Sequence, residues 1–561
     1  MGAWIDTGGL LIEGVRIDPQ LGGLEPGNAE TAGSRPSPVE DGAIWIAGGR
    51  IRAIGPRDAI ASLAGRGAAR FDGQGALALP GLWDSHLHLG AWAMARSRVD
   101  LRGCRDLDEV ASRLRARDAT LAPGVWLVAV ALERHRVDPG GAGLDGRLLD
   151  RLFPHRPVAV FTHDLHSVVV NRRAFELLAP GGPDAAWPQG AVVQKDPCSG
   201  EPTGVLQERA VEMVDSMIAP GLPELTQQIA QAQVELARLG IAGVQTPDGP
   251  DEFAALSVLR QRGALRLRVR FLPPVSMLDT LKSAGIRQGF GDEWLALGQV
   301  KAFADGSLGS LTAALFEPYA HSQSPSHRGQ LLMDAGAVAT LAAEAARAGF
   351  GLAIHAIGDR ACRAVVDGLE RARSEGAWLP TLPYRMEHVQ LIRPEDMRRL
   401  AALGVVASMQ PVHAPSDRPA VERHWVGRTS RAYAWRSLRR SGVVLAFGSD
   451  APVETADPLD GLFAALTGQW RSDAPGPSGW HHDETLSLAE AVAAYTAGAA
   501  AAVGEQEVRG TLRPGMAGDV VLVSPDLREA DPATPEGLQA WRRARVVATI
   551  VGGQVVYPPP A

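Results

Sequence analysis

Short apolar runs alternate with longer amphipathic stretches through the middle of the chain. Apolar runs bounded by glycine, proline or polar residues predict buried strands, and apolar residues spaced three and four apart predict helices. Strands are expected at 77–89, 241–246, 267–272, 298–303, 351–355, 384–388, 405–410 and 443–450, and helices at 225–239, 335–348, 360–373, 394–403 and 458–470. This alternation is typical of a parallel α/β architecture. Eight strands with interleaved helices predict a (β/α)8 TIM barrel.

Both ends of the chain are instead rich in short strands. Strands are expected at 10–17, 43–54, 76–79, 519–523 and 546–556, and we predict that they pair into one small β-sandwich. The stretch Pro19–Pro38 is rich in turn residues and predicts a mobile surface loop. Near the end, residues 485–501 predict one helix, with Ser487 and Glu490 as a capping box.

The predicted domains follow from these patterns. Residues 1–78 and 508–561 are expected to form the composite sandwich, and residues 79–91 and 223–507 the barrel. Residues 92–222 do not fit a short crossover and predict a subdomain inserted after strand one. Within it, strands are expected at 125–131 and 158–162, and a loop-rich stretch at 181–204.

Two histidines one residue apart end the first strand of the predicted barrel. In a strand, side chains at i and i+2 share a face, so His86 and His88 point the same way if the strand persists. Two such imidazoles can share a metal. An isolated pair of this kind also occurs by chance, so the prediction depends on further ligands elsewhere in the chain.

The ends of the other predicted strands supply such ligands. Lys301, His355, His388 and Asp450 fall late in strands four, five, six and eight, and a TIM barrel gathers these ends at one mouth. Taken singly, three of these residues have a structural explanation. His355 could lie in the core, His388 could pair with Glu387, and Asp450 could cap the segment that follows. Together, the imidazoles and the carboxylate favour a Zn²⁺-type hydrolytic site with open positions for water.

Composition excludes several other classes of protein. The 561 residues carry a net charge of −7 without a dense basic cluster, which argues against a nucleic-acid partner. No stretch resembles a signal peptide or a membrane span, so we expect a cytoplasmic protein. The expected partner is a small-molecule substrate. The three cysteines form no C-x-x-C pair, and the zincin, serine-hydrolase and P-loop motifs are missing.

Lysine is rare in this chain. It occurs only at Lys195, Lys282 and Lys301, whereas arginine is abundant. A lysine inside an apolar strand therefore suggests a role for an amine that a guanidinium cannot fill.

Several motifs resemble the amidohydrolase superfamily, in particular its YtcJ-like or N-substituted-formamide-deformylase-like branch (amidohydrolase family 3). They are residues 80–88 (PGLWDSHLH), 200–206 (GEPTGVL), 300–310 (VKAFADGSLGS), 354–360 (IHAIGDR), 386–389 (MEHV), 448–453 (GSDAPV) and 510–519 (GTLRPGMAGD). The resemblance covers nearly the whole chain. It implies a binuclear metal site, with His86, His88 and Asp450 on one metal, His355 and His388 on the other, and Lys301 bridging as a carbamate.

The resemblance also implies a mechanism, in which the metals lower the pKa of a bound water toward roughly 7 and polarise the substrate carbonyl. Asp450 is expected to take the water's proton and pass it to the leaving amine. His166 is the candidate donor to the tetrahedral oxyanion, since the family carries a histidine in this segment. Asp164, Arg385 and His413 are candidate substrate contacts.

The expected activity is hydrolysis of a C–N bond other than a peptide bond, in an amide or an N-acyl or N-formyl amine. Three alternatives stay open: hydrolysis of an ester, lactone or cyclic amidine, a metal-assisted isomerisation, and a metal-binding barrel without turnover. If Lys301 is an unmodified ammonium paired with Asp305, the site holds one metal instead of two. Zinc is the expected metal, and the assembly is left open, with a homodimer as one alternative.

Overall fold

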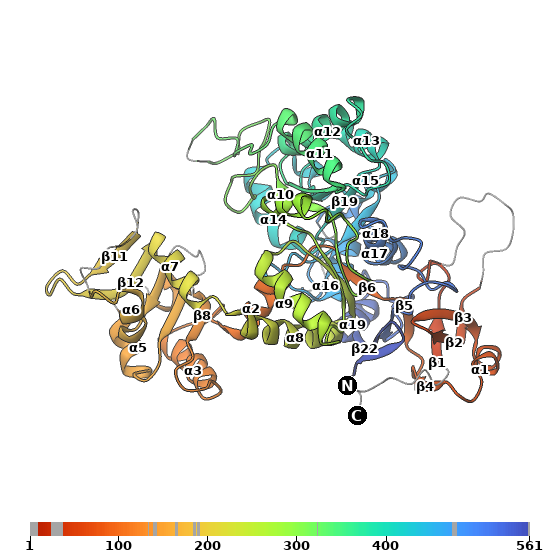
Figure 1. The fold of residues 1–561 in the computed structure, drawn as a ribbon, viewed down its shortest axis with the longest axis horizontal. Coiled ribbons are helices and arrows are strands. Elements are labelled where there is room, and N and C mark those ends of the chain that lie inside the picture. The colour runs from red at the N-terminus through yellow and green to blue at the C-terminus, as the bar shows by residue number, and fades with distance from the viewer. Residues whose placement is uncertain are drawn as a thin grey trace. The chain divides into compact units, whose positions relative to one another are not determined.

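A computed structural model describes residues 9–23, 37–132, 134–138, 143–162, 167–182, 187, 191–322, 324–473 and 480–558. The chain divides into two compact units (Figure 1). The larger unit comprises Met1–Gly90 and Ile229–Ala561, and the smaller one Ala91–Gln228. The predicted loop at Pro19–Pro38 lies largely outside the described residues.

Strands from both ends of the chain join in one eight-stranded sheet of the larger unit. Its order is β23-β22-β21-β5-β1-β2-β3, and β4 pairs with β1. The strands are β1 (Leu10–Ile17), β2 (Val39–Ala47), β3 (Arg50–Pro56), β4 (Ala69–Asp72), β5 (Leu77–Pro80), β21 (Val520–Ser524), β22 (Arg545–Val551) and β23 (Gln554–Tyr557). Ile12, Ile44, Val520 and Ile550 are fully buried in its core. Its arrangement as a sandwich stays a prediction.

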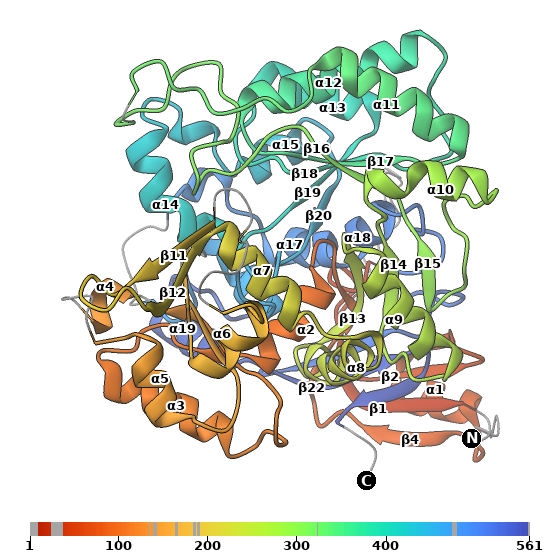
Figure 2. The same cartoon turned by 60° about the vertical axis from the view of Figure 1, so that its left-hand side comes forward.

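Two parallel sheets form the rest of the larger unit (Figure 2). One has the order β15-β14-β13-β6 and the other β16-β17-β18-β19-β20. Their strands are β6 (Leu82–Asp84), β13 (Ile241–Thr246), β14 (Arg268–Phe271), β15 (Leu295–Leu297), β16 (Val300–Phe303), β17 (Leu352–Ala356), β18 (Arg385–His388), β19 (Val406–Met409) and β20 (Leu445–Phe447). The parallel α/β prediction is confirmed.

Backbone hydrogen bonds link these two sheets at two places. Lys301, in β16, donates its backbone N–H to the carbonyl oxygen of Pro273, two residues after β14, over 2.8 Å. Ser85 N donates to Phe447 O over 3.0 Å, which joins the end of β6 to β20. The carboxyl ends of the first and last parallel strands therefore lie beside each other.

Helices connect and cover the strands, as the amphipathic stretches predict. In Figure 2, α11, α12 and α13 lie along the strands β16–β19. The helices of the larger unit are α1 (Arg57–Ala64), α9 (Pro250–Gln261), α10 (Leu278–Ser283), α11 (Ala335–Ala348), α12 (Asp359–Ser374), α13 (Pro394–Leu403), α14 (His413–His424), α15 (Trp435–Arg440), α16 (Pro458–Thr467), α17 (Leu488–Tyr495), α18 (Ala497–Ala501) and α19 (Pro535–Arg543). Among the residues that the structure describes, no helix is long and apolar enough to cross a membrane.

The ends of these helices have local causes in the sequence. The side chain of Asp334 caps α11 by accepting from Ala337 N, and Gly349 ends it in the left-handed conformation at φ 78°. Pro394 opens α13 and Gly404 closes it in the same conformation. Polar caps, proline in the first turn and glycine after the last turn are the usual helix boundaries.

Two predicted elements of the larger unit differ in the structure. The apolar run from Leu77 is two strands, β5 and β6, because the chain passes at Gly81 from the terminal sheet to the parallel sheet. A Cβ at Gly81 would lie 2.7 Å from the Cβ of Ala242 and 2.8 Å from that of Asp519, so only glycine fits this crossing. The helix predicted at 485–501 is also two helices, with a break at Thr496, although the capping box of Ser487 and Glu490 is present.

The smaller unit has its own sheet and core. The sheet order is β11-β12-β10-β9-β8-β7, and Leu114, Leu127 and Val158 are among its fully buried residues. Its elements are β7 (Val99–Asp100), β8 (Leu127–Leu132), β9 (Val158–Thr162), β10 (Ser167–Val170), β11 (Ala191–Lys195), β12 (Pro202–Glu208), α3 (Leu107–Asp118), α4 (Arg134–Val137), α5 (Gly146–Leu152), α6 (Arg172–Leu178) and α7 (Arg209–Ile218). Helices α2 (Leu89–Ser97) and α8 (Leu222–Arg238) carry the chain into and out of it.

The prediction of a loop-rich stretch at 181–204 is wrong for its second half, because β11 and β12 form an antiparallel hairpin there. Most side chains of β11 are exposed or only half-buried, so the apolar signal of a buried strand is missing there.

Candidate functional site

The histidines expected at the strand ends lie together in the larger unit. The ring centroid of His388 is 4.9 Å from that of His86 and 4.5 Å from that of His355, and His86 and His88 are 5.5 Å apart. One detail of the prediction is wrong: β6 ends at Asp84, so His86 and His88 lie in the segment that follows the strand. The remaining members occupy β16, β17, β18 and the residues after β20.

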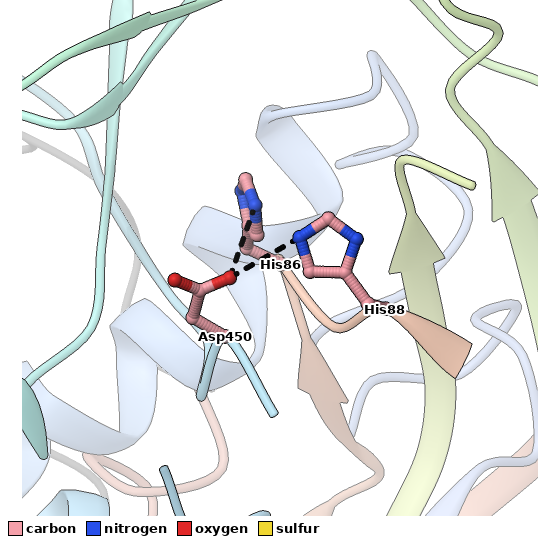
Figure 3. Close-up of side chains that lie close together, drawn as sticks. All are labelled: His86, His88 and Asp450. Atoms are coloured by element: carbon pink, nitrogen blue, oxygen red, sulfur yellow. Dashed lines mark ion pairs between the residues drawn. The ribbon is translucent and has the colours of Figure 1, made fainter. Parts of the chain in front are cut away.

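His86 and His88 share one carboxylate oxygen of Asp450 (Figure 3). Nε2 of His86 lies 3.5 Å and Nε2 of His88 lies 3.4 Å from Oδ1 of Asp450. These three ligand atoms are close enough to hold one metal ion. Two imidazoles and a carboxylate are ligands that Zn²⁺ accepts in catalytic sites.

The second oxygen of Asp450 faces another histidine. Nε2 of His413, at the start of α14, lies 3.3 Å from Oδ2 of Asp450. His388, His413 and Asp450 form a second group whose ligand atoms lie within 4.8 Å of one another. His413, expected from the sequence as a substrate contact, therefore lies beside the potential metal ligands themselves.

Three of the imidazoles are oriented from behind by protein side chains. Nδ1 of His86 lies 2.6 Å from Oε2 of Glu387, and Nδ1 of His388 lies 2.8 Å from Oε1 of Gln410. Nδ1 of His88 lies 3.7 Å from Oδ1 of Asp248. Because these oxygens can only accept, the Nδ1 atoms of His86 and His388 carry a proton and their Nε2 atoms keep a lone pair. His88 contacts carboxylates through both of its nitrogens. Histidines that bind metals are commonly oriented in this way.

His355 is held differently. Its Nε2 donates to the carbonyl oxygen of Gly306 over 3.0 Å and lies 3.6 Å from Oδ1 of Asp305. The lone pair of this imidazole is therefore on Nδ1. The carboxylate of Asp305 is buried and accepts backbone N–H groups of Ala314, Ile357 and Gly358.

Asp84 joins the segments that carry the first cluster. It accepts from the backbone N–H groups of His86 and Ser449, both over 3.0 Å, and from the hydroxyl of Ser449 over 2.5 Å. A Cβ at Gly448 would lie 2.5 Å from His86 N, so no side chain fits between the two segments. Asp450 N donates to His86 O over 2.6 Å, which completes this junction.

Two residues of the site have left-handed backbone conformations. His388 has φ 72° and Asp450 has φ 59°. Such conformations are unfavourable for residues with a side chain, and they concentrate at functional sites. At His388 the conformation breaks the alternation of β18, so that both Glu387 and His388 are directed at His86.

Arg385 lies beneath the ligands and is 1% exposed. Its guanidinium donates to both carboxylate oxygens of Glu387, to the backbone oxygen of Ser85, to the hydroxyl of Ser408 and to the amide oxygen of Gln245. All of these partners belong to the protein. The arrangement fixes Glu387, and through it the ring of His86.

Lys301 is buried beside the histidines without a polar partner. Its Nζ has no hydrogen bond within the part of the chain that the structure describes, Asp305 included. The ring of Phe303 lies 4.9 Å from Nζ. A buried amine without a partner is costly in its charged form, and burial lowers the pKa of Lys301 to about 8.

The electrostatics of the cluster suit a cation. Burial lowers the pKa of His86 to about 4 and of His355 to about 3, and it holds the pKa of His388 well below its usual range, so these rings are neutral at pH 7. Burial alone would raise the pKa of Asp450, but its hydrogen bonds with His413 and His88 hold that pKa well below its usual range. Neutral imidazoles and an ionised carboxylate are the forms that bind metals.

His88 and His413 differ from these three rings, because contacts with carboxylates outweigh burial and raise the pKa of both. Burial lowers the pKa of His88, but hydrogen bonds with Asp248 and Asp450 outweigh burial and raise the pKa to about 9. A cation bound at this cluster would displace that proton.

Two predicted site residues cannot be placed. Asp164 and His166 lie outside the described residues, so their roles as a substrate contact and an oxyanion donor stay predictions.

The sequence analysis missed four residues that shape the site: Asp84, Asp248, Glu387 and Gln410. Glu387 and Asp84 lie in the motifs 386–389 and 80–88, so their position next to ligands was a usable signal. Asp248 follows β13 at a strand end, where a carboxylate in a parallel α/β protein is a candidate site residue. Gln410 follows β19 in the same way.

Comparisons with known proteins agree with this geometry. The model of the amidohydrolase family matches residues 70–557. The putative amidohydrolase YtcJ of Bacillus subtilis is 29% identical over 86% of this chain and 89% of its own. The N-substituted formamide deformylase of Arthrobacter pascens is 25% identical over 94% of this chain and 97% of its own. An uncharacterised metal-dependent hydrolase of Pyrococcus furiosus has a similar structure, with a TM-score of 0.74 and 27% identity over 94% of this chain and all of its own.

An α/β fold with imidazole and carboxylate ligands gathered at its strand ends defines a metal-dependent hydrolase. The chain belongs to the amidohydrolase family, and its relatives include members of the YtcJ-like branch.

Proposed function

We propose that the protein hydrolyses a C–N bond of a small molecule, in an amide or an N-acyl or N-formyl amine. The observation that carries this proposal is the orientation of His86 and His388, whose Nδ1 atoms face protein acceptors while their Nε2 atoms stay available for a cation. The name of the Arthrobacter relative, a formamide deformylase, describes cleavage of such a bond and supports the choice of substrate class.

The proposed fold of the catalytic unit is a (β/α)8 barrel. Parallel pairing within both sheets and the backbone hydrogen bonds between the two sheets support closure into a barrel. We further propose the terminal sandwich at 1–78 and 508–561, the barrel at 79–91 and 223–507, and the insertion at 92–222. Four further statements stay predictions: a cytoplasmic location, a homodimer, a small-molecule substrate and the lack of a nucleic-acid partner.

His86, His88 and Asp450 would hold one divalent cation, and His355 and His388 a second, with zinc as the proposed metal. Lys301 would bridge the two as a carbamate, formed when the amine nitrogen bonds to the carbon of CO₂ and loses a proton. Burial of the amine without a hydrogen-bond partner supports this modification. The ring of Phe303 near Nζ favours the alternative, an unmodified ammonium beside a single metal.

The proposed reaction divides between the cation and the chain. A divalent cation lowers the pKa of water toward roughly 7 and polarises a carbonyl. Asp450 accepts a proton from the attacking water and passes it to the nitrogen of the leaving amine, so that one C–O bond forms and the C–N bond breaks. His413 holds Asp450 from its second oxygen. Because Arg385 contacts protein groups, we assign it a positioning role through Glu387 in place of the expected substrate contact.

Metal content per chain tests the proposal, measured for the wild type, for Lys301→Ala and for a control, Lys282→Ala. Lys282 is exposed on α10 and is remote in sequence from every proposed ligand. About two metals in the wild type and the control, falling sharply in Lys301→Ala, are expected for a bridged pair. One metal, unchanged in Lys301→Ala, would contradict the binuclear site.

The reaction itself is tested on a panel of N-formyl and N-acetyl amines, with esters, lactones and cyclic amidines alongside. Turnover of the amines is expected. Turnover of the other substrates alone would move the activity to the alternative class. A metal-loaded protein without turnover of any of them would support a metal-binding role.

A further inference from the structure

Three large apolar side chains are exposed in segments that adjoin the candidate ligands. Phe303 at the end of β16 is 49% exposed, Leu332 is 52% exposed and Val453 is 61% exposed. We call these three residues the apolar wall. All three belong to the larger unit.

The backbone ties each member of the apolar wall to the potential ligands. Phe303 pairs in register with His355, and their ring centroids are 5.2 Å apart. Leu332 N donates to Ala304 O over 2.8 Å, directly after Phe303. Val453 N donates to Asp450 O over 3.0 Å, so Val453 lies one turn beyond the carboxylate.

Strand geometry explains why Phe303 faces the site. Side chains two residues apart in a strand project from the same face, so Phe303 follows Lys301 on the face that carries the ligands. Lys301 is 3% exposed, whereas the ring of Phe303 is half-exposed one step farther along the strand. A large ring in this position is usually covered by the protein core or by a ligand.

Small-molecule sites commonly combine a few polar groups that fix the reacting atoms with apolar side chains that bind the rest of the ligand. The histidines and Asp450 supply the polar part here. The apolar wall supplies exposed apolar surface beside them, at the ends of β16 and β20 and next to Ala304.

We propose that the apolar wall binds an apolar substituent of the substrate, aromatic or branched aliphatic, next to the bond that is cleaved, and that Phe303 is its specificity-determining residue. This inference rests on the proposed function and narrows its substrate class. A substrate without such a substituent would leave the ring of Phe303 in water while the reacting group is bound.

Two hydroxamic acids test the inference without requiring turnover. Acetohydroxamate and benzohydroxamate chelate a metal through the same two oxygens and differ in an apolar ring. Their dissociation constants are measured by calorimetry on the zinc-loaded full-length protein, for the wild type, Phe303→Ala, Phe303→Leu and a control, Phe290→Ala. Phe290 is 61% exposed and lies ahead of β15, toward the opposite ends of the strands.

The wild type and Phe290→Ala are expected to bind benzohydroxamate at least about tenfold more tightly than acetohydroxamate. Phe303→Ala should lose most of this preference at unchanged affinity for acetohydroxamate and unchanged zinc content, and Phe303→Leu should keep part of it. Equal affinities in the wild type, or a preference that survives in Phe303→Ala, would overturn the apolar wall while leaving the metal site intact. If neither compound binds the zinc-loaded protein, the proposed metal site fails, and the inference fails with it.

Discussion

Buried charged groups lie at both ends of the parallel strands, but their partners differ between the two ends. At the amino end, the guanidinium of Arg268 donates to both oxygens of Asp519 over 2.8 and 3.0 Å. Arg270 and Arg509 both contact Glu505 over 2.7 Å. At the carboxyl end, imidazoles surround Asp450, and Nζ of Lys301 has no hydrogen-bond partner among the described residues.

The difference separates stability from function. At the amino end, Asp519 and Glu505 come from the segment that leads into the terminal sheet, so their ion pairs fasten that sheet to the strands of the larger unit. At the carboxyl end, the neutral rings of His86 and His388 lie beside Asp450, whose carboxylate pairs with His88 and His413. Neutral imidazoles beside an ionised carboxylate are the groups that bind a metal cation.

Of the variants that test this comparison, a replacement of Asp450 is expected to have the largest effect. Asp450→Asn removes the group proposed to move the proton, so turnover should fall by about 10²–10⁴-fold while at least one metal stays bound. Steady-state kinetics and metal analysis measure the two effects. As a control, Asp460→Asn changes a carboxylate on α16 that pairs with Arg471 outside the site, and its turnover should equal that of the wild type. Full activity of Asp450→Asn would remove Asp450 from the mechanism.

Breaking an ion pair at the amino end of the strands should lower the stability of the protein and leave the candidate site intact. Arg268→Met leaves Asp519 buried without its partner, which should lower the free energy of unfolding by about 3–5 kcal/mol. Chemical denaturation measures the loss. The matched control is Arg238→Met, which breaks a surface pair with Glu235 and should cost less than about 1 kcal/mol. An equal loss of unfolding free energy in both variants, or a changed metal content in the folded Arg268→Met, would contradict the proposed difference between the two ends of the strands.

The smallest effect is expected from the residues that orient the imidazoles. Glu387→Gln weakens the acceptor behind His86, so metal affinity should fall by about 10–100-fold. Competition with a chelator of known affinity measures it. Glu395→Gln, on the exposed pair with Arg363, is the control and should bind metal as the wild type does. Unchanged affinity in Glu387→Gln would mean that the ring of His86 is held by packing alone.

The pattern of apolar residues predicted the parallel strands well because burial on both faces leaves a continuous apolar run. The bounds of β13, α11 and α13 agree with the prediction to the residue. The hairpin of β11 and β12 escaped because exposed strands lack that signal. The short strand β15 was missed as well, since three apolar residues are too few to stand out.

The candidate ligands were predictable from residue type and position at strand ends, as His355, His388 and Asp450 illustrate. Their partners were not, because the contacts of His88 with Asp248 and of His388 with Gln410 join residues that only the fold brings together. The environment of Arg385 was equally hidden. Its sequence position fits a substrate contact, whereas its burial among Glu387, Ser408 and Ser85 fits a positioning role.

By itself, the sequence determined the parallel α/β class, the family and the residue types of the candidate metal site, because strand patterning and strand-end chemistry are local properties of the chain. The tertiary structure alone decided how Asp84 joins the ends of β6 and β20, which imidazole nitrogen stays available, and that Phe303 is exposed beside the ligands. These features depend on distances between residues far apart in the chain, and such distances are set by how the strands pack against one another.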